Sequence, residues 1–176
     1  MEKLVILLKS KMLLIGSIIR IPLSDYRNAY CQYVLKDRMG PMIAVFDLIT
    51  TSPIDLNSLD GVCYLFPPII TGLYAAVRTK LWEKVGCLPV ISFEYKGFIS
   101  PRYDFKSGEV IMWFFWNGDD YIKLGKILPE EYKDLELLIG WNPYSVVERI
   151  ETGKLGSAYE GLIKNNRAFP IKAGKD

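Results

Sequence analysis

The 176-residue sequence contains no histidine, and this absence removes several kinds of active site at once. Histidine is the usual general base at neutral pH, the partner of the nucleophile in Ser-His-Asp and Cys-His enzymes, and the commonest zinc ligand. The sequence is also poor in cysteine: Cys31, Cys63 and Cys87 form no CxxC pair and have apolar neighbours. We therefore expect reduced, buried thiols and a cytoplasmic location.

Excess charge and long hydrophobic runs are missing as well. The 22 Lys and Arg residues nearly balance the 20 Asp and Glu residues, which gives a net charge of +2, whereas nucleic-acid-binding domains are commonly strongly basic. The uncharged stretch at residues 61–77 contains Pro67 and Pro68, and it is shorter than the roughly 20 residues of a spanning helix. Lys9 and Lys11 end the apolar run at residues 4–8, which is short for a signal-peptide core and predicts a strand or short helix there. We expect neither a nucleic acid nor a membrane as partner.

Alternating apolar residues and turn-forming residues predict a mainly β fold. Residues 17–23, 29–36 and 42–49 are typical of a three-stranded meander. Further strands are predicted at residues 82–85, 90–98, 110–116, 119–126 and 137–141. The expected fold class is α+β, mainly β, built as a twisted antiparallel sheet or a partly open barrel.

One or two short helices are expected toward the C-terminus. Pro129 opens a helical turn, because proline suits the first turn of a helix. Asn142 can cap a longer helix that begins at Pro143 and ends at Gly153. A last helix is predicted around residues 159–163.

The rest of the chain shows no repeat and no low-complexity linker. A short helix at residues 71–80, with Thr71 as its cap, competes there with a strand. We predict a single domain over residues 1–164, followed by a loose tail at residues 165–176.

The strongest local signal is a hairpin around Asn117-Gly118. A two-residue type I′ turn at this dipeptide would pair Trp113 with Ile122 and Phe114 with Tyr121. One face of the hairpin then reads as a core face and carries Ile111, Trp113, Phe115, Ile122 and Leu124. The other face mixes aromatic, methionine and charged side chains: Met112, Phe114, Trp116, Asp119, Tyr121 and Lys123. This mixture is typical of a protein-binding surface, and burial under another segment is the alternative.

Acidic residues gather around this hairpin. Eight acids and four lysines lie between residues 104 and 136. The adjacent pairs Asp119-Asp120 and Glu130-Glu131 fit solvated turns and a helix first turn better than an acid–base pair across a cleft. We expect no catalytic residue, no cofactor and no metal. The candidate residues for contact with a protein partner are Trp116, Asp119, Asp120, Tyr121, Glu130 and Glu131.

Three stretches occur in an order that points to a known family. They are GSIIRIPL at residues 16–23 with Asp25 and Ala29-Tyr30, VFD at 45–47 with FPP at 66–68, and Trp82…Val85-Gly86…Leu88-Pro89-Val90…Phe93. Together they resemble the immunity protein 26 family of bacterial polymorphic toxin systems, over about residues 16–98 and more loosely to residue 153. Ser17 and Cys31 depart from the pattern, where an acidic residue and a glycine are expected.

The resemblance implies a cytoplasmic, non-enzymatic antitoxin that binds and neutralises a cognate toxin domain. Steric occlusion would need an interface of about 1,200–2,000 Å², with aromatic anchors for affinity and an acidic patch that attracts a basic toxin. Two other classes stay open from the residues alone. One is a nucleic-acid-binding β-barrel, against which the near-neutral charge argues. The other is a hydrolase that uses carboxylates alone, which requires two acids that converge in a cleft.

Overall fold

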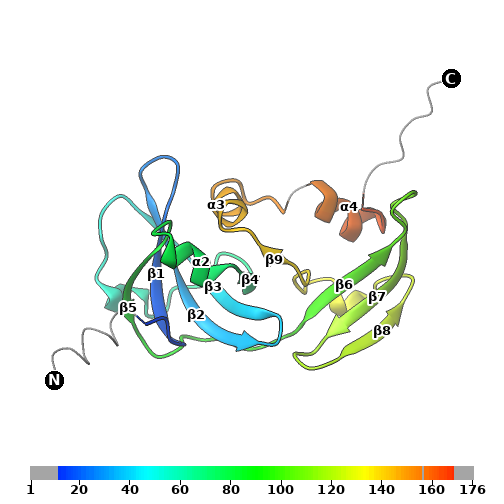
Figure 1. Ribbon diagram of the computed structural model, residues 1–176, viewed down its shortest axis with the longest axis horizontal. Coiled ribbons are helices and arrows are strands. Elements are labelled where there is room, and N and C mark those ends of the chain that lie inside the picture. Colours follow the sequence, from blue (N-terminus) through cyan, green and yellow to red (C-terminus); the bar gives the residue numbers. More distant parts are fainter. Residues whose placement is uncertain (1–11, 156, 169–176) are drawn as a thin grey trace. The chain divides into compact units, whose positions relative to one another are not determined.

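The computed structural model describes residues 12–155 and 157–168, which fall into two units with a sheet each (Figure 1). Unit 1 comprises residues 1–94 and 140–152, and unit 2 comprises residues 95–139 and 153–176. The expected mainly β class is confirmed, in the form of two open sheets with short helices. The strand or helix predicted at residues 4–8 lies outside the described residues.

Unit 1 contains a six-stranded sheet in the order β5-β1-β2-β3-β4-β9. Its strands are β1 (Ser17–Pro22), β2 (Asn28–Asp37), β3 (Gly40–Thr50), β4 (Ile69–Thr71), β5 (Glu83–Cys87) and β9 (Gly140–Trp141). All neighbouring pairs are antiparallel except β4 and β9, which are parallel. The predicted meander is confirmed as β1-β2-β3, because its turn residues fall between the strands that alternation predicts.

Strand β1 lies inside this sheet, between β5 and β2. Ile18 and Ile19 point to opposite faces and are both 0% exposed, so the sheet is covered on both sides here. Pairing with β5 ends at Arg20, opposite Glu83. Pro22 therefore lies beyond the last β5 pair, where its missing N–H removes no ladder bond on that side.

The predicted strand at residues 90–98 is wrong up to residue 97, since only Phe98 belongs to a strand. The fully buried Gln32 side chain donates its amide to the carbonyls of Leu88 and Pro89, at 3.2 and 2.9 Å. Its Oε1 accepts the N–H of Ile91 at 2.9 Å. Gln32 thus pairs backbone groups of this segment that a neighbouring strand would otherwise pair.

The cysteine prediction holds only in part. Cys31 on β2 is buried, whereas Cys63 and Cys87 are exposed free thiols. Cys87 ends the edge strand β5, in which no residue is fully buried. Apolar neighbours in the sequence are therefore not enough to bury a residue at the border of a sheet.

The short helix α2 (Leu73–Arg78) begins after Gly72, without a side-chain cap. The prediction of Thr71 as its cap is wrong. Thr71 is the last residue of β4, and its hydroxyl donates to the carbonyl of Trp141 at 2.9 Å. The short helix predicted at residues 71–80 is confirmed as α2, and the competing strand there is wrong, because β4 ends at Thr71. A short 3₁₀ helix, η1 (Leu56–Leu59), completes this part of unit 1.

Helix α3 (Pro143–Thr152) is confirmed with its predicted start and end. The side chain of Asn142 accepts the N–H of Tyr144 at 2.9 Å, and Gly153 has a φ of 69° after the last turn. Arg149 was not expected inside, yet it is 5% exposed and its guanidinium lies 4.0 Å from the ring centre of Phe66. Stacking on an aromatic ring stabilises this buried cation.

Unit 2 contains a three-stranded antiparallel sheet in the order β6-β7-β8, which Figure 1 shows side by side. Its elements are β6 (Phe98–Tyr103), β7 (Val110–Trp116), β8 (Tyr121–Gly125), the 3₁₀ helix η2 (Glu130–Tyr132) and α4 (Ser157–Asn165). The predicted strand at 137–141 is limited to β9, and Leu137 bridges Ile99 instead. The core of unit 2 consists of Ile99, Val110, Trp113, Leu128, Leu137, Leu162 and Ala168.

Residues 166–168, which the sequence places in the tail, are hydrogen-bonded to the sheet. The indole of Trp113 donates to the side-chain oxygen of Asn166 at 2.7 Å. The guanidinium of Arg167 donates to the carbonyl of Ser107 at 2.6 Å, and the N–H of Ala168 donates to that of Gly108 at 2.8 Å. Residues 169–176 lie outside the described residues. The division into a domain at 1–164 and a tail stays a prediction.

In the part of the chain that the structure describes, every helix is too short or too polar to cross a lipid bilayer.

Candidate protein-binding surface

The turn between β7 and β8 contains four residues, 117–120, so the predicted two-residue turn is wrong. The side chain of Asn117 accepts the N–H groups of Asp119 and Asp120, both at 2.9 Å. The backbone N–H of Asn117 donates to the carbonyl of Asp120 at 3.3 Å. These side-chain bonds stabilise a wider loop than the type I′ turn that Asn-Gly favours.

The wider loop changes the pairing of the strands. Trp116 lies opposite Tyr121, and Phe115 lies opposite Ile122. The predicted pairs of Trp113 with Ile122 and Phe114 with Tyr121 are therefore wrong. Because the shift is two residues and side chains alternate with a period of two, Trp116 and Tyr121 still lie on one face.

This face carries an aromatic cluster at the turn end of the hairpin. The rings of Trp116 and Tyr121 are 4.8 Å apart between centroids, and those of Phe114 and Tyr121 are 6.1 Å apart. Trp116 is 4% exposed, whereas Tyr121 is 48% exposed. The face is thus neither open nor covered as a whole: Trp116 is a buried support and Tyr121 presents its ring to solvent.

The acidic candidates lie on two different elements. Asp119 and Asp120 are exposed on the turn, next to Tyr121. Glu130 and Glu131 are exposed on η2, where Glu130 forms an ion pair with Lys133 at 2.5 Å. The structure therefore groups Trp116, Asp119, Asp120 and Tyr121 in one stretch of hairpin and places the two glutamates on a separate helix. Among the described residues, no three Cys, Asp or Glu side chains are grouped as metal ligands.

The predicted core face is only partly buried. Trp113 is 0% exposed, but Ile111 and Ile122 are 49% and 47% exposed. Tyr103 pairs with Val110 and Arg102 pairs with Met112, so Ile111 is an extra residue in β7. Such a β-bulge redirects side chains. Because of this bulge, Ile111 is exposed at the surface, and Val110 packs in the core with Trp113.

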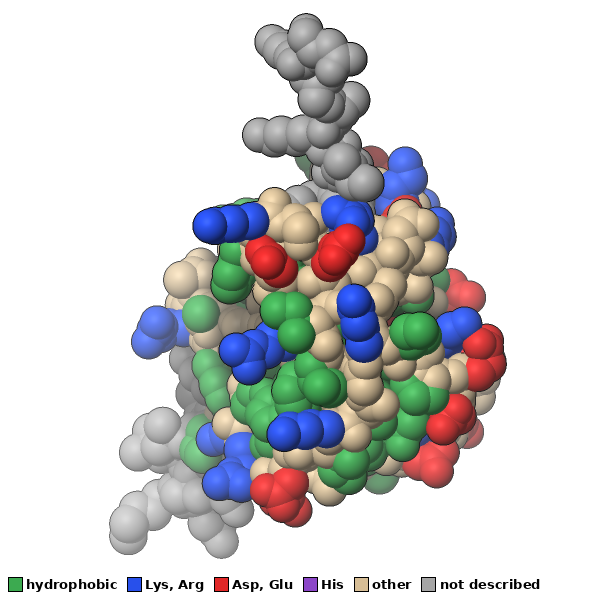
Figure 2. Space-filling model, turned by 90° about the vertical axis from the view of Figure 1, so that its right-hand side faces the viewer, with side chains coloured by type: hydrophobic (Ala, Val, Ile, Leu, Met, Phe, Trp, Pro, Cys, Tyr) green, Lys and Arg blue, Asp and Glu red, His purple; other side chains and the backbone are tan. Residues whose placement is uncertain are grey.

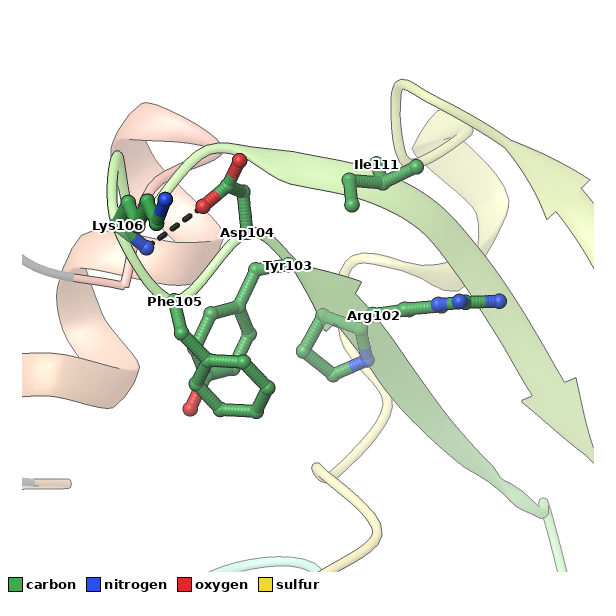
Figure 3. Close-up of a pocket in the computed structure, with 7 residues that line it drawn as sticks. Arg102, Tyr103, Asp104, Phe105, Lys106 and Ile111 are labelled. Carbon is green, nitrogen blue, oxygen red and sulfur yellow. Dashed lines mark hydrogen bonds between the residues drawn. The ribbon is translucent and has the colours of Figure 1, made fainter.

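An open pocket of about 640 Å³ lies beside this bulge. It is lined by Pro101, Arg102, Tyr103, Asp104, Phe105, Lys106 and Ile111 (Figure 3). The rings of Tyr103 and Phe105 lie next to each other, with centroids 5.3 Å apart. These residues form no pattern in the sequence that predicts a binding site. The available signal was a polar turn, Asp104 to Gly108, that holds a phenylalanine between two strands.

Figure 2 shows hydrophobic side chains beside lysine and arginine side chains on one face, with several acidic side chains near its edge. A surface of this composition can supply both apolar contacts and charge complementarity to a protein partner.

Comparison with known proteins gives one positive finding. No curated protein and no solved structure matches the chain. The family model described as Immunity protein 26 matches residues 15–107. This range is more than half of the chain and includes the stretches on which the resemblance rests. The chain therefore belongs to the immunity protein 26 family, which indicates an immunity role.

Proposed function

We propose that this chain is an antitoxin that binds a cognate toxin domain and blocks it sterically, without catalysis of its own. The family supports the immunity role. The observation that supports this binding surface is the exposed ring of Tyr121, held against the buried ring of Trp116 beside the acidic turn. The proposed site of action is the cytoplasm, and no membrane or nucleic acid is part of the complex.

The geometry of the hairpin suits protein recognition. A tyrosine supplies a large contact area at a small entropic cost, because it has few rotatable bonds. Packing on Trp116 restricts its ring further before binding. The exposed carboxylates of Asp119 and Asp120 would attract a basic toxin and raise the association rate.

The location of the candidate residues supports different roles for the part of the chain that matches the family and for the part that follows it. The family match ends at residue 107, and all six candidate residues follow it. All six also belong to unit 2. We propose that the matched residues 15–107, which cover most of unit 1 and continue through β6 into unit 2, are the framework common to the family, and that the β7–β8 hairpin and η2 recognise the particular toxin.

The two alternative functions find less support. The carboxylate hydrolase needs two acids that converge, whereas the adjacent acid pairs lie on a turn and on a separate 3₁₀ helix. Neither pair lines the open pocket of unit 2. The nucleic-acid-binding module would need more positive charge than the net +2 of the chain supplies.

Co-expression with the toxin domain encoded beside this chain tests the proposal. We expect the toxin to stop growth alone and growth to continue when this chain is present. Tyr121→Ala should weaken protection and raise the Kd about tenfold or more, because an anchor at an interface contributes about 1–2 kcal/mol or more. Tyr144→Ala is the matched control, since Tyr144 is 70% exposed on α3 of unit 1.

If Tyr121→Ala and Tyr144→Ala bind the toxin with the same Kd, Tyr121 is not an anchor and another surface contacts the toxin. Growth arrest that persists with the intact chain at high expression would contradict the function itself. Turnover of a substrate by the purified chain, abolished by one carboxylate substitution, would replace the antitoxin with an enzyme.

A further inference from the structure

The pocket of unit 2 combines apolar surface with two unpaired cations. Phe105 is 84% exposed and Ile111 is 49% exposed, so both present apolar surface to solvent. Arg102 and Lys106 line the same pocket. Within residues 12–155 and 157–168, neither cationic group forms an ion pair. In Figure 3 the Arg102 side chain extends away from the Phe105 and Tyr103 rings, and Lys106 lies on the other side of these rings.

The single acid in the pocket is engaged by its own loop. One carboxylate oxygen of Asp104 accepts the N–H groups of Lys106 and Ser107, at 2.6 and 3.2 Å. This arrangement closes the turn that connects β6 and β7. Two cations and one partly engaged carboxylate thus line the pocket, which carries a net positive charge.

The rim of the pocket is held in place before any ligand binds. Arg167 donates to the Ser107 carbonyl and to a carboxylate oxygen of Glu109, both at 2.6 Å. Gly108 is buried, and its N–H donates to the carbonyl of Asp104 at 2.7 Å. A preformed site loses less conformational entropy on binding than a mobile one.

We infer that this pocket binds a segment of the toxin partner in which a large apolar side chain stands between two carboxylates. The inference rests on the proposed function and names the chemistry of its partner. The apolar side chain would contact Phe105 and Ile111, while Arg102 on one side and Lys106 on the other would each pair with one of the flanking carboxylates. Burial of the apolar group supplies affinity, and the charge pairs fix the orientation of the segment.

A peptide fits this pocket better than a nucleic acid. Strong binding of a nucleic acid requires several phosphate contacts, and the pocket offers only two cations. The described residues of unit 2 contain nine acids and nine lysines and arginines, so they offer a polyanion no excess of positive charge. A segment with one or two carboxylates needs no such excess.

The pocket and the acidic turn lie at opposite ends of β7. Ile111 is near its beginning, and Trp116 is its last residue, followed by the turn with Asp119 and Asp120. At about 3.3 Å per residue this separation is about 15–20 Å. Both ends fit within one interface of standard size, about 800 Å² per partner. The toxin would therefore need a basic region about this far from its acidic, apolar segment, and it would bind in one orientation.

Short fluorescent peptides test this inference without the toxin. The first has tryptophan between two aspartates, the second has lysines in place of the aspartates, and the third has serine in place of tryptophan. Single-stranded oligo(dT) is the nucleic-acid probe. We expect the first peptide to bind with a Kd of about 1 mM or lower, the other peptides at least about fivefold more weakly, and oligo(dT) not at all.

Two variants with matched controls locate the binding. Arg102→Glu should weaken the first peptide at least about fivefold and remove most of its salt dependence. Lys96→Glu makes the same charge change at an exposed residue near the turn end of the sheet and should not weaken binding. Ile111→Ser should also weaken binding, whereas Ile127→Ser, at a residue 77% exposed, should not.

Equal binding of the three peptides, tighter binding of oligo(dT), or equal losses in the variants and their controls would overturn the inference. So would the absence of any binding by the first peptide at millimolar concentration. The protection assay uses the toxin and no peptide. A chain that protects cells but fails these tests would therefore refute only the pocket. A chain that binds the peptide but does not protect would refute the antitoxin function and the toxin as the source of the segment, while the preference of the pocket for such a peptide would stand.

Discussion

The two sheets differ in how much of their surface they bury. In unit 1, Ile43, Ala44 and Val45 on β3 are all 0% exposed, so both faces of this strand are covered. In unit 2, no residue of β8 is buried, and Tyr121 and Ile122 are about half exposed. The covered strands at the centre of the unit 1 sheet cannot contact a partner through their side chains, whereas the exposed residues of β8 can. This difference is why we propose unit 2 as the part of the molecule that recognises the toxin.

The largest expected effect is that of Trp113→Ala, which removes the most buried aromatic side chain of unit 2. Trp113 is 0% exposed, and its indole bonds to Asn166. Loss of a buried tryptophan costs about 3–5 kcal/mol, a large part of the stability of a typical domain. We expect the amides of β6, β7 and β8 to lose their protection in hydrogen exchange measured by mass spectrometry.

The same experiment shows whether the units fold separately. Protection that persists in β1, β2 and β3 of the Trp113→Ala variant would show that unit 1 is stable alone. An equal loss of protection in both units would support the prediction of one cooperative domain over residues 1–164. It would also weaken the comparison between a framework and a recognition unit.

The next largest effect is expected in unit 1, at Gly16. This residue has a φ of 93°, and a Cβ added to it would lie 2.3 Å from the carbonyl oxygen of Leu88. Gly16→Ala should therefore lower the free energy of unfolding by about 2 kcal/mol or more, as measured by urea denaturation. Gly61→Ala is the control, because Gly61 has a φ of 74° but open space around it, and it should cost only about 1 kcal/mol.

Much of the fold of unit 1 follows from local sequence. The meander and helix α3 were predicted because alternation, turn residues and helix caps act over a few residues. The irregular segment at residues 88–97 was not predicted, because it depends on Gln32, which lies far from it in the sequence. A polar residue within a strand gives no sign of which distant backbone groups it will bind.

The candidate site was predictable only to the level of its hairpin. Alternation placed Trp116 and Tyr121 on one face, but not their degrees of exposure, which depend on packing. The side chain of Asn117 changed the pairing, and the bulge at Ile111 moved a predicted core residue to the surface. Both changes are single-residue effects that a period-two pattern does not contain.

A smaller effect on stability is expected from the buried thiol of Cys31. Burial raises its pKa, so the thiol stays neutral in the folded state while it ionises in the unfolded state near pH 8.5. This contribution to stability is complete below that pH and is lost as the pH rises. Between about pH 8.5 and 9.5, the unfolding free energy should fall by about 1 kcal/mol more in the native chain than in Cys31→Ala. Equal falls in the two proteins, measured by urea denaturation, would show that Cys31 is accessible to water.

The smallest effect on stability, and the most specific to the comparison, is expected from charge reversal at the turn of unit 2. Asp119→Lys with Asp120→Lys should leave the unfolding free energy within about 0.5 kcal/mol, because both residues are exposed and Asn117 binds their backbone. Association with a basic toxin should slow about tenfold at low ionic strength and become less dependent on salt. Stopped-flow or surface-based kinetics over a range of salt concentrations measures both.

Reversal of two other charges, in unit 1, distinguishes attraction by the acidic turn from an effect of the net charge of the chain. Asp47→Lys with Asp60→Lys changes the net charge by the same amount, and both residues are exposed. If the acidic turn attracts the toxin, association should slow strongly only for the unit 2 variant, because the field of an exposed charge is screened beyond about 8–10 Å. If both variants slow equally, the attraction belongs to the chain as a whole, and the turn has no special part in recognition.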